Sequence, residues 1–219
     1  MDESGVAARE KSLGPSRNAV EVEELERSER LSFGTDAIAM HGIIFGELKK
    51  LVDTRLGGDT WRQVLKESGL ETKVYMPVAE YPDEDAVSIV GALSRRSGKS
   101  VRELFEEFGE FIAPDLLALY RHMVKPEWRT LELLENTENT IHRVVRIRNP
   151  GARPPELKCV RDGEEVLITY GSARRMCGVA VGIVRGLARH YDENIVIHEL
   201  SCMSGGAAVC RILVRRIAN

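Results

Sequence analysis

The sequence lacks any apolar stretch that approaches the roughly 20 residues needed to cross a bilayer. It also begins without the basic start and apolar centre of a secretory signal peptide. A formal net charge of −3 over 219 residues gives no electrostatic reason to expect a nucleic-acid partner. We therefore expect a cytoplasmic protein that binds neither membrane nor nucleic acid.

Cysteines and enzyme motifs are scarce as well. In a reducing compartment, four cysteines are expected to be free thiols or metal ligands rather than disulfides. The chain has no Gly-x-Ser-x-Gly or His-Glu-x-x-His motif, no phosphate-binding loop and no dinucleotide fingerprint. The sequence therefore points to none of the common catalytic sites.

The first 39 residues differ in composition from the rest of the chain. They hold nine acidic and five basic residues but a single aromatic residue, Phe33. Such a segment cannot bury enough apolar surface to offset the entropy lost on ordering. We expect residues 1–39 to be a disordered extension, with a short charged helix conceivable at 20–30, and residues 40–219 to be the domain. The alternative is an over-long gene start with Met40 as the true first residue; in either case residues 1–39 are expected to be dispensable.

From Met40 onward, the first part of the domain has apolar residues at helical spacing. Ser100 and Glu103 have the spacing of a capping box, and Arg95 and Arg96 precede Gly98 where a helix is expected to end. This part is therefore expected to be helical. The expected helices cover residues 42–57, 59–70, 81–98, 100–111, 114–123 and 128–149.

After a turn segment at 149–155, the pattern alternates as in a sheet. A long, mostly apolar helix is expected to interrupt that sheet at 172–191. Helices first, then a sheet interrupted by one helix, predict an α+β fold in which a helical subdomain packs on an antiparallel sheet. Strands are expected at 156–162 and 164–170, joined by Asp162-Gly163, and at 194–203 and 207–217, joined by Gly205-Gly206.

One of the five histidines differs from the others in its surroundings. His142 lies at a helical position near Leu134, Ile141 and Val145, which predicts burial, whereas His41, His122 and His190 lie among polar or boundary residues. A lone buried histidine is usually a hydrogen-bonded core residue, so its position alone does not define a site.

The stretch ITYGSARRMCG places two hydroxyls and a guanidinium at alternate positions where a strand is expected to become a helix. Tyr170 and Ser172 should point the same way, so that their hydroxyls can share one target. Arg174, expected at the helix start, offers a planar fork suited to a carboxylate, and the helix N-terminus would add to an anion site. Without a ligand, the same pattern also fits a chance sequence in an exposed turn.

Three features of the sequence become specific when taken as a set. The start MHGIIFGELKKLV, the Pro154-Pro155 pair at +12 and +13 from His142, and YGSARRM followed by a helix with Gly182 and Gly186 occur in this order. Together they make residues 40–219 resemble the haem nitric oxide/oxygen-binding (H-NOX) family, which includes the sensor domain of soluble guanylate cyclase.

The resemblance implies a haem b buried between the helical subdomain and the sheet, with His142 as the iron ligand and a proline pressed on the porphyrin. The haem carboxylates need charge and hydrogen bonds inside protein, and the resemblance assigns them to Tyr170, Ser172 and Arg174. The second ring nitrogen of His142 needs an acceptor, for which Glu138 and Asn139 are candidates. The implied pocket residues are Ile44, Leu116, Pro155, Val179 and Ile183.

The implied function is gas sensing rather than catalysis. The resemblance implies a stand-alone sensor of nitric oxide that also binds carbon monoxide and signals to a histidine kinase or a cyclic-dinucleotide enzyme when His142 is released. Oxygen-binding members place a tyrosine nine residues after the signature tyrosine, where this chain has Val179. We therefore expect no stable oxygen complex, with one question left open: an apparent insertion between Gly109 and His142 leaves the place of Tyr120 undecided.

The cysteines offer a rival interpretation. Cys177, His198, Cys202 and Cys210 come from neighbouring elements and could form a tetrahedral zinc site, as in some bacterial members of the family. The ordinary alternative is small buried cysteines, and the remaining Cys159 is expected to be structural. A zinc or thiol redox sensor, with haem secondary or absent, is thus the rival function, and a haem-free binding module on the same scaffold is a third.

Overall fold

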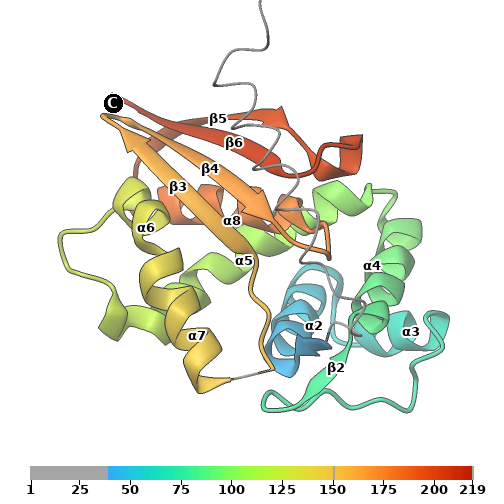
Figure 1. The fold of residues 1–219 in the computed structure, drawn as a ribbon. Helices are drawn as coiled ribbons and strands as arrows, with labels where there is room; N and C mark the ends of the chain where they lie inside the picture. Colours follow the sequence, from blue (N-terminus) through green and yellow to red (C-terminus); the bar gives the residue numbers. More distant parts are fainter. Residues whose placement is uncertain (1–38, 150, 219) are drawn as a thin grey trace, which may run out of the picture. The chain divides into compact units, whose positions relative to one another are not determined.

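Helices occupy the first part of the chain and an interrupted sheet the second, which confirms the predicted α+β class (Figure 1). The computed structural model describes residues 39–149 and 151–218, so the expected extension at 1–39 lies outside the described residues except for Ala39. The first elements are β1 (Ala39–His41), α2 (Gly42–Leu56), α3 (Thr60–Glu67), β2 (Glu80–Pro82), α4 (Asp83–Ser97) and α5 (Val101–Tyr120). The others are η1 (Arg121–Met123), α6 (Thr130–Asn136), η2 (Glu138–His142), α7 (Arg143–Arg148), β3 (Glu156–Asp162), β4 (Glu165–Gly171), α8 (Cys177–His190), β5 (Asn194–Ser201), η3 (Met203–Gly205) and β6 (Cys210–Ile217).

Helix α5 begins at the capping box that the sequence predicts. The Ser100 hydroxyl accepts from the backbone N–H of Glu103 at 3.2 Å, and the Glu103 carboxylate accepts from the Ser100 N–H at 2.7 Å. The helix then runs through Pro114 to Tyr120, so the segments expected to be helical at 100–111 and 114–123 belong to one continuous helix up to Tyr120. Burial of the preceding Ile112 and Ala113 holds the backbone helical despite the hydrogen bond that proline removes.

In the described part of the chain, no helix combines the length and apolar character needed to span a membrane.

Helices α2 to α5 share one apolar core. Its largest fully buried side chains come from all four helices, and Tyr75 adds a ring stacked on Phe45 with centroids 4.2 Å apart. The core supplies one wall of the apolar cavity described below. Its fully buried members include Phe45, Val52, Val64, Ile89 and Ile112.

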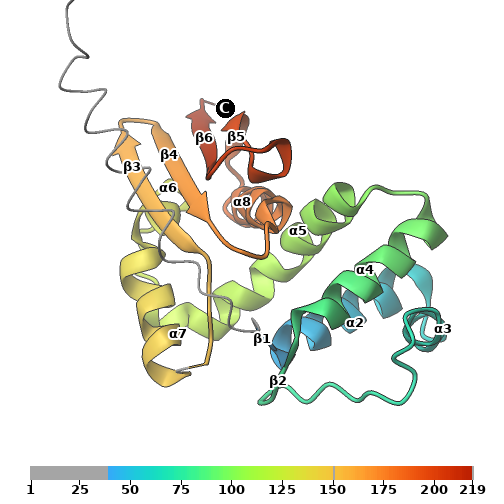
Figure 2. The same ribbon diagram turned by 45° about the vertical axis from the view of Figure 1, so that its right-hand side comes forward.

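The sheet has the strand order β3-β4-β6-β5, with every neighbouring pair antiparallel. Alternate residues of β4 are buried, which gives the sheet one apolar face, and α8 and α6 pack against that face (Figure 2). The predicted hairpin at Asp162-Gly163 is present, with Gly163 at a positive φ of 55°. The sheet core comprises Val166, Ile168 and Tyr170 of β4, Ile212 and Val214 of β6, and Val181, Val184 and Leu187 of α8.

Glycines let α5 and α8 approach at backbone distance. A Cβ added at Gly182 would lie 2.0 Å from the carbonyl oxygen of Glu106, and one at Gly109 would lie 2.1 Å from the carbonyl oxygen of Val179. Because α5 also belongs to the N-terminal core, this contact joins the helical part of the domain to the sheet.

We expect Gly182→Ala to destabilise the fold by about 1–3 kcal/mol or more, because the clash is with backbone and cannot be relieved by a rotamer change. Urea unfolding of the purified protein measures this. Gly46→Ala is the matched control: Gly46 is an exposed helical glycine with open space around it, and alanine there should add about 1 kcal/mol of stability. Equal stability of the two variants would contradict this account of the α5–α8 contact.

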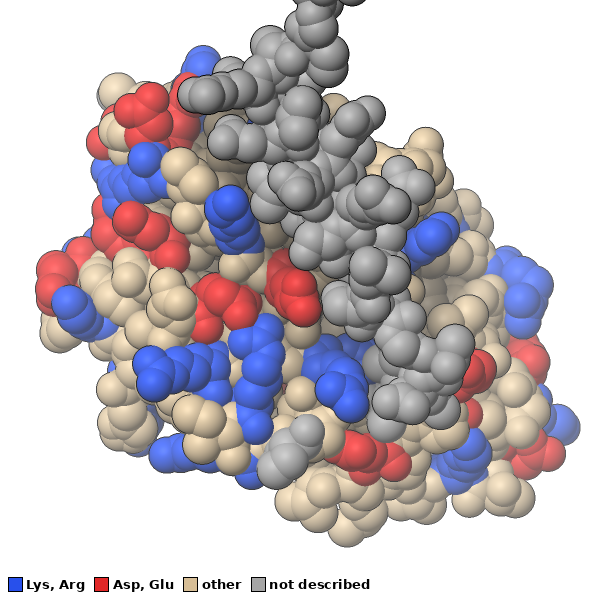
Figure 3. All heavy atoms as spheres, in the orientation of Figure 1, with Lys and Arg blue, Asp and Glu red and all other residues tan. Residues whose placement is uncertain are grey.

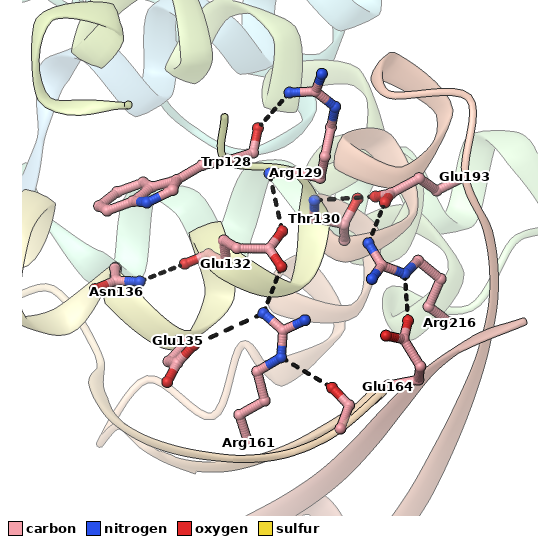
Figure 4. Close-up of polar contacts among 11 residues, drawn as sticks. Trp128, Arg129, Thr130, Glu132, Glu135, Asn136, Arg161, Glu164, Glu193 and Arg216 are labelled. Carbon is pink, nitrogen blue, oxygen red and sulfur yellow. Dashed lines mark hydrogen bonds and ion pairs between the residues drawn. The ribbon is translucent and has the colours of Figure 1, made fainter. Parts of the chain in front are cut away.

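The N-terminal end of α6 is fixed to the sheet by charged groups (Figure 4). The Glu193 carboxylate, just before β5, accepts from the first helical N–H, that of Thr130, at 3.0 Å and from Arg216 of β6 at 2.8 Å. Glu132 accepts from the N–H of Arg129 at 3.0 Å and from the guanidinium of Arg161 on β3 at 2.5 Å. These bonds satisfy N–H groups that a helix start leaves unpaired, and they anchor α6 to the sheet.

Candidate functional site

His142 lies at the end of η2, a π-helical segment between α6 and α7. Its N–H donates to the carbonyl oxygen of Thr137 five residues earlier, at 3.0 Å. The hydroxyls of Thr137 and Thr140 donate to carbonyls four residues earlier, each at 2.6 Å. Such side-chain bonds compete with the regular helical ladder, and π-segments of this kind are frequent at functional sites.

The imidazole of His142 is held by Glu138, one turn earlier. Its Nδ1 lies 3.0 Å from the Glu138 carboxylate, and the His142 side chain is 14% exposed. Of the two candidate acceptors, the exposed Asn139 makes no described contact with the ring, whereas Glu138 does. A carboxylate only accepts hydrogen bonds, so the proton of a neutral imidazole belongs on Nδ1 and the lone pair of Nε2 is free for a metal.

Burial and nearby charges favour a neutral His142 and an ionised Glu138, the protonation states in which the imidazole can bind a metal. Burial lowers the pKa of His142, and the guanidinium of Arg146 lowers it further, although the Glu138 carboxylate opposes both. Burial alone would raise the pKa of Glu138, but hydrogen bonds from Arg146 and His142 bring it below its usual value. The imidazole is therefore neutral and the carboxylate ionised near neutral pH. Figure 3 shows the basic side chains that gather over α7, the helix that carries Arg146.

Pro155 lies beside His142: its backbone carbonyl accepts a hydrogen bond from the imidazole, which acts to raise the pKa of the ring. Two residues later, the N–H of Leu157 donates to the Glu138 carboxylate at 3.2 Å. In the sheet, Leu157 pairs with Tyr170. The structure thus brings the histidine, the proline and the Tyr-x-Ser-x-Arg pattern to one region of the domain.

The three signature residues form a short hydrogen-bonded chain. The buried Tyr170 hydroxyl bonds to Ser172, and the Ser172 hydroxyl accepts from the N–H of Arg174 at 3.3 Å. Burial raises the pKa of Tyr170 to about 12. The expectation that Arg174 starts the following helix was wrong: α8 begins at Cys177, and a turn closed by the Arg175 N–H on the Ser172 carbonyl precedes it.

Arg174 also ties the sheet to α4. Its Nε donates to Asp83 at 2.8 Å and its Nη1 donates to the carbonyl of Arg153 at 2.5 Å. Burial raises the pKa of Asp83 although Arg174 opposes the shift, and the second oxygen of this carboxylate is buried with no partner among the described residues. A guanidinium with two hydroxyl groups beside it is a donor set that suits a carboxylate of a ligand.

An apolar cavity of about 40 Å³ lies among α2, α4, α5 and α8. Of the expected pocket residues, Ile44 and Val179 line it, while Leu116 and Ile183 pack against the same core. Tyr120 is half-buried at the end of α5 and is not among the lining residues. No lining residue in the described ranges carries a charged or hydrogen-bonding side chain. The lining consists of Met40, Ile44, Leu48, Leu51, Ala86, Val90, Leu93, Leu104, Phe105, Phe108, Met176 and Val179.

Several of these lining residues were missed at the sequence level. Phe105 and Phe108 share one face of α5 at i, i+3 spacing, a pattern that predicts burial but not which pocket the face lines. Met176 comes from the turn before α8 and carries no periodic signal. The donor set, the free Nε2 of His142 and the apolar lining together fit a haem with a small gas bound to its iron.

The histidines at 41, 122 and 190, which the sequence places among polar or boundary residues, lie outside this site. His41 caps α2, accepting from the N–H of Ile43 at 3.5 Å, and His122 and His190 are exposed.

Three cysteines form a separate cluster. The sulfurs of Cys177, Cys202 and Cys210 all lie within 4.8 Å of one another, with Cys202 Sγ 3.6 Å from Cys177 Sγ and 3.9 Å from Cys210 Sγ. The fourth expected ligand, His198, is exposed on β5 and outside the cluster. Burial raises the pKa of Cys177 to about 12, whereas at Cys202 burial is outweighed by hydrogen bonds from Ser204 and Cys177, which lower the pKa of that thiol.

Comparison with known proteins identifies the family. A family model described as haem-NO-binding matches residues 41–199, so the chain belongs to this family, as the resemblance predicts. No curated protein sequence matches the chain.

Solved structures share the fold. An H-NOX protein from S. oneidensis in the Fe(II)NO state is 24% identical, with a TM-score of 0.77 over 82% of this chain and 100% of that one. Unliganded Fe(II) H-NOX from K. algicida is 22% identical, with a TM-score of 0.73 over 82% and 98%. A mutant of T. tengcongensis H-NOX is 21% identical, with a TM-score of 0.71 over 82% and 98%. Family membership indicates a haem-binding gas-sensor domain.

Proposed function

We propose that this chain is a haem-based sensor of nitric oxide in which His142 would be the protein ligand of a haem b iron. The observation that carries the proposal is the buried imidazole of His142, whose Nδ1 is engaged by Glu138 so that Nε2 is left for a metal. The lining of the cavity is apolar, which suits a small uncharged ligand. The donor groups of Tyr170, Ser172 and Arg174 suit the haem carboxylates.

The haem supplies a ferrous iron that binds diatomic gases; the chain supplies the response. His142 would hold the iron, and Pro155 lies beside His142. If binding of nitric oxide released His142, η2 and α7 would be free to move, and they would form a two-state element biased by a ligand. We propose that a separate partner, a histidine kinase or a cyclic-dinucleotide enzyme, reads this movement. The sensor would comprise residues 40–219, with residues 1–39 dispensable.

The rival function is a sensor based on zinc or thiols, with haem secondary or absent. Membership of a haem-NO-binding family does not support it. The thiol cluster is best regarded as an additional metal site on the same domain, since it is formed by α8, the β5–η3 junction and β6 rather than by the residues around His142.

The absorbance spectrum tests the proposal. Protein produced with ample haem supply should show a strong Soret band, which His142→Ala should abolish because the iron loses its protein ligand. His190→Ala, at an exposed histidine, should keep the band. Free imidazole added to His142→Gly should restore it, which separates loss of the ligand from misfolding. The proposal fails if the unaltered protein takes up no haem.

A further inference from the structure

Glu138 connects three segments of the chain through one carboxylate. Its Oε2 accepts from His142 Nδ1 at 3.0 Å and from the N–H of Leu157 at 3.2 Å, and its Oε1 accepts from Arg146 at 2.6 Å. The partners belong to η2, β3 and α7. The Glu138 side chain is 26% exposed, so these bonds form in partly desolvated surroundings, where they are stronger than in water.

A carboxylate that accepts from the second nitrogen of a histidine raises the basicity of the nitrogen that binds the metal, and it fixes the orientation of the ring. We propose that Glu138 is a positioning residue that sets the strength of the bond between His142 and iron, and that it couples release of His142 to strand β3. This inference rests on the proposed function, because it assumes that His142 is the iron ligand.

The Glu138 carboxylate accepts hydrogen bonds from two groups besides His142, and these weaken its effect on the imidazole. The Arg146 guanidinium and the Leu157 N–H donate to the same carboxylate, so the hydrogen bond from His142 Nδ1 to that carboxylate is weaker than it would be without them. Removing the carboxylate should weaken the iron–histidine bond. Removing Arg146 should strengthen that bond, because more of the charge then falls on His142. The two substitutions are therefore expected to act in opposite directions.

The coupling to β3 follows from the difference between the two ends of the segment that runs from α6 through η2 to α7: its first end is anchored and the part around His142 is not. The start of α6 is held by Glu193 and by Arg161 (Figure 4). We therefore expect movement after release of His142 to be confined to η2 and α7. Glu138 lies within that moving part yet holds the Leu157 N–H, and Leu157 is the sheet partner of Tyr170. Displacement of Glu138 would act on the pair of strands β3 and β4, which carries Tyr170 and is followed by Ser172 and Arg174.

Three variants test the proposal. Glu138→Gln keeps the size of the side chain but loses its charge, and Arg146→Gln removes the competitor. Glu135→Gln is the matched control, because Glu135 is a neighbouring glutamate whose side chain is 44% exposed and whose described ion pair is with Arg161 at 3.8 Å. The measurements are the iron–histidine stretching frequency of the unliganded ferrous protein and the rate at which the six-coordinate nitrosyl complex becomes five-coordinate.

Glu138→Gln should lower the stretching frequency and speed the conversion about 10- to 100-fold, the range over which such outer partners change metal binding. Arg146→Gln should shift both in the opposite sense, and Glu135→Gln should change neither. Shifts of the same sign in Glu138→Gln and Arg146→Gln would indicate mere loosening of the helix and overturn the proposal, as would a Glu138→Gln protein identical to the unaltered one.

A haem-free measurement separates this inference from the proposed function. Nitrogen NMR of His142 in protein stripped of haem should show a neutral ring protonated at Nδ1, and Glu138→Gln should shift the tautomer population. A ring protonated at Nε2 in the unaltered protein would overturn the inference even if haem binds. A protein that takes up no haem would instead defeat the proposed function.

Discussion

Ferrous protein mixed with air is expected to form no stable oxygen complex, and Val179→Tyr is expected to create one. Oxygen bound to ferrous haem carries partial negative charge and needs a hydrogen-bond donor on its side of the pocket. Val179 lines a cavity in which no described lining side chain is a donor. A hydrogen bond to a charged acceptor contributes about 1.5–3 kcal/mol, which corresponds to roughly 10- to 100-fold in affinity.

Visible spectra of reduced protein in air measure this directly. Val179→Phe is the control, because it adds the ring without the hydroxyl and should still fail to hold oxygen. Carbon monoxide and nitric oxide should bind all three proteins, with nitric oxide giving a five-coordinate complex as His142 is released. A lasting oxygen spectrum in the unaltered protein would contradict the prediction. Tyr120→Phe would then show whether Tyr120 is the donor, although Tyr120 lies outside the lining.

The elements of the fold could be predicted where the signal is local. The capping box at Ser100 and Glu103 and the turn at Asp162-Gly163 depend on neighbouring residues alone, and both are present. The continuation of α5 through Pro114 could not be predicted in this way. Proline disfavours a helix locally, and only burial of the adjacent residues against the core overrides it.

In the candidate site, too, local features could be predicted from the sequence, whereas contacts between distant segments could not. The residue types at His142 and in the Tyr-x-Ser-x-Arg pattern were visible in the sequence, and so was the nearby partner Glu138, one helical turn from His142. The partners that lie far away in the sequence were not. Arg174 meets Asp83 across 91 positions of sequence, and nothing in the acidic start of α4 distinguishes Asp83 from its neighbours. Asp85, two residues on, is 5% exposed and bound by Lys73 and Tyr75, a buried role that the sequence indicated only as a favourable helix-start charge.

The placement of His198 outside the thiol cluster depends on an irregularity in strand β5. The pairing of β5 with β6 shifts register between Glu199 and Ser201, so residues before the shift do not share a face with those after it. Cys202 therefore meets the other thiols while His198 faces solvent. Near the cluster, Glu199 pairs with Arg102 at 2.6 Å, and the same guanidinium lies 4.0 Å from Cys202 Sγ.

Protein purified without added zinc is expected to hold about one zinc ion per chain, and Cys202→Ser is expected to lose it. Three thiols within 4.8 Å of one another supply the soft ligands that zinc prefers, and zinc binding deprotonates them whatever their pKa in the metal-free state. The cluster joins α8 to the end of β5 and the start of β6, so loss of the ion should also lower the melting temperature.

Metal analysis of three further variants identifies the ligands. Cys159→Ser should keep the zinc, because Cys159 lies on β3 outside the cluster, and His198→Ala should keep it because His198 is exposed. Cys177→Ser should lose it. Zinc-free reduced protein would defeat the prediction, and loss of zinc in His198→Ala would mean that β5 rearranges to bring the histidine in. If the site is formed as expected, oxidation of two of its thiolates by hydrogen peroxide should release the ion, because a disulfide sulfur is no longer a thiolate ligand.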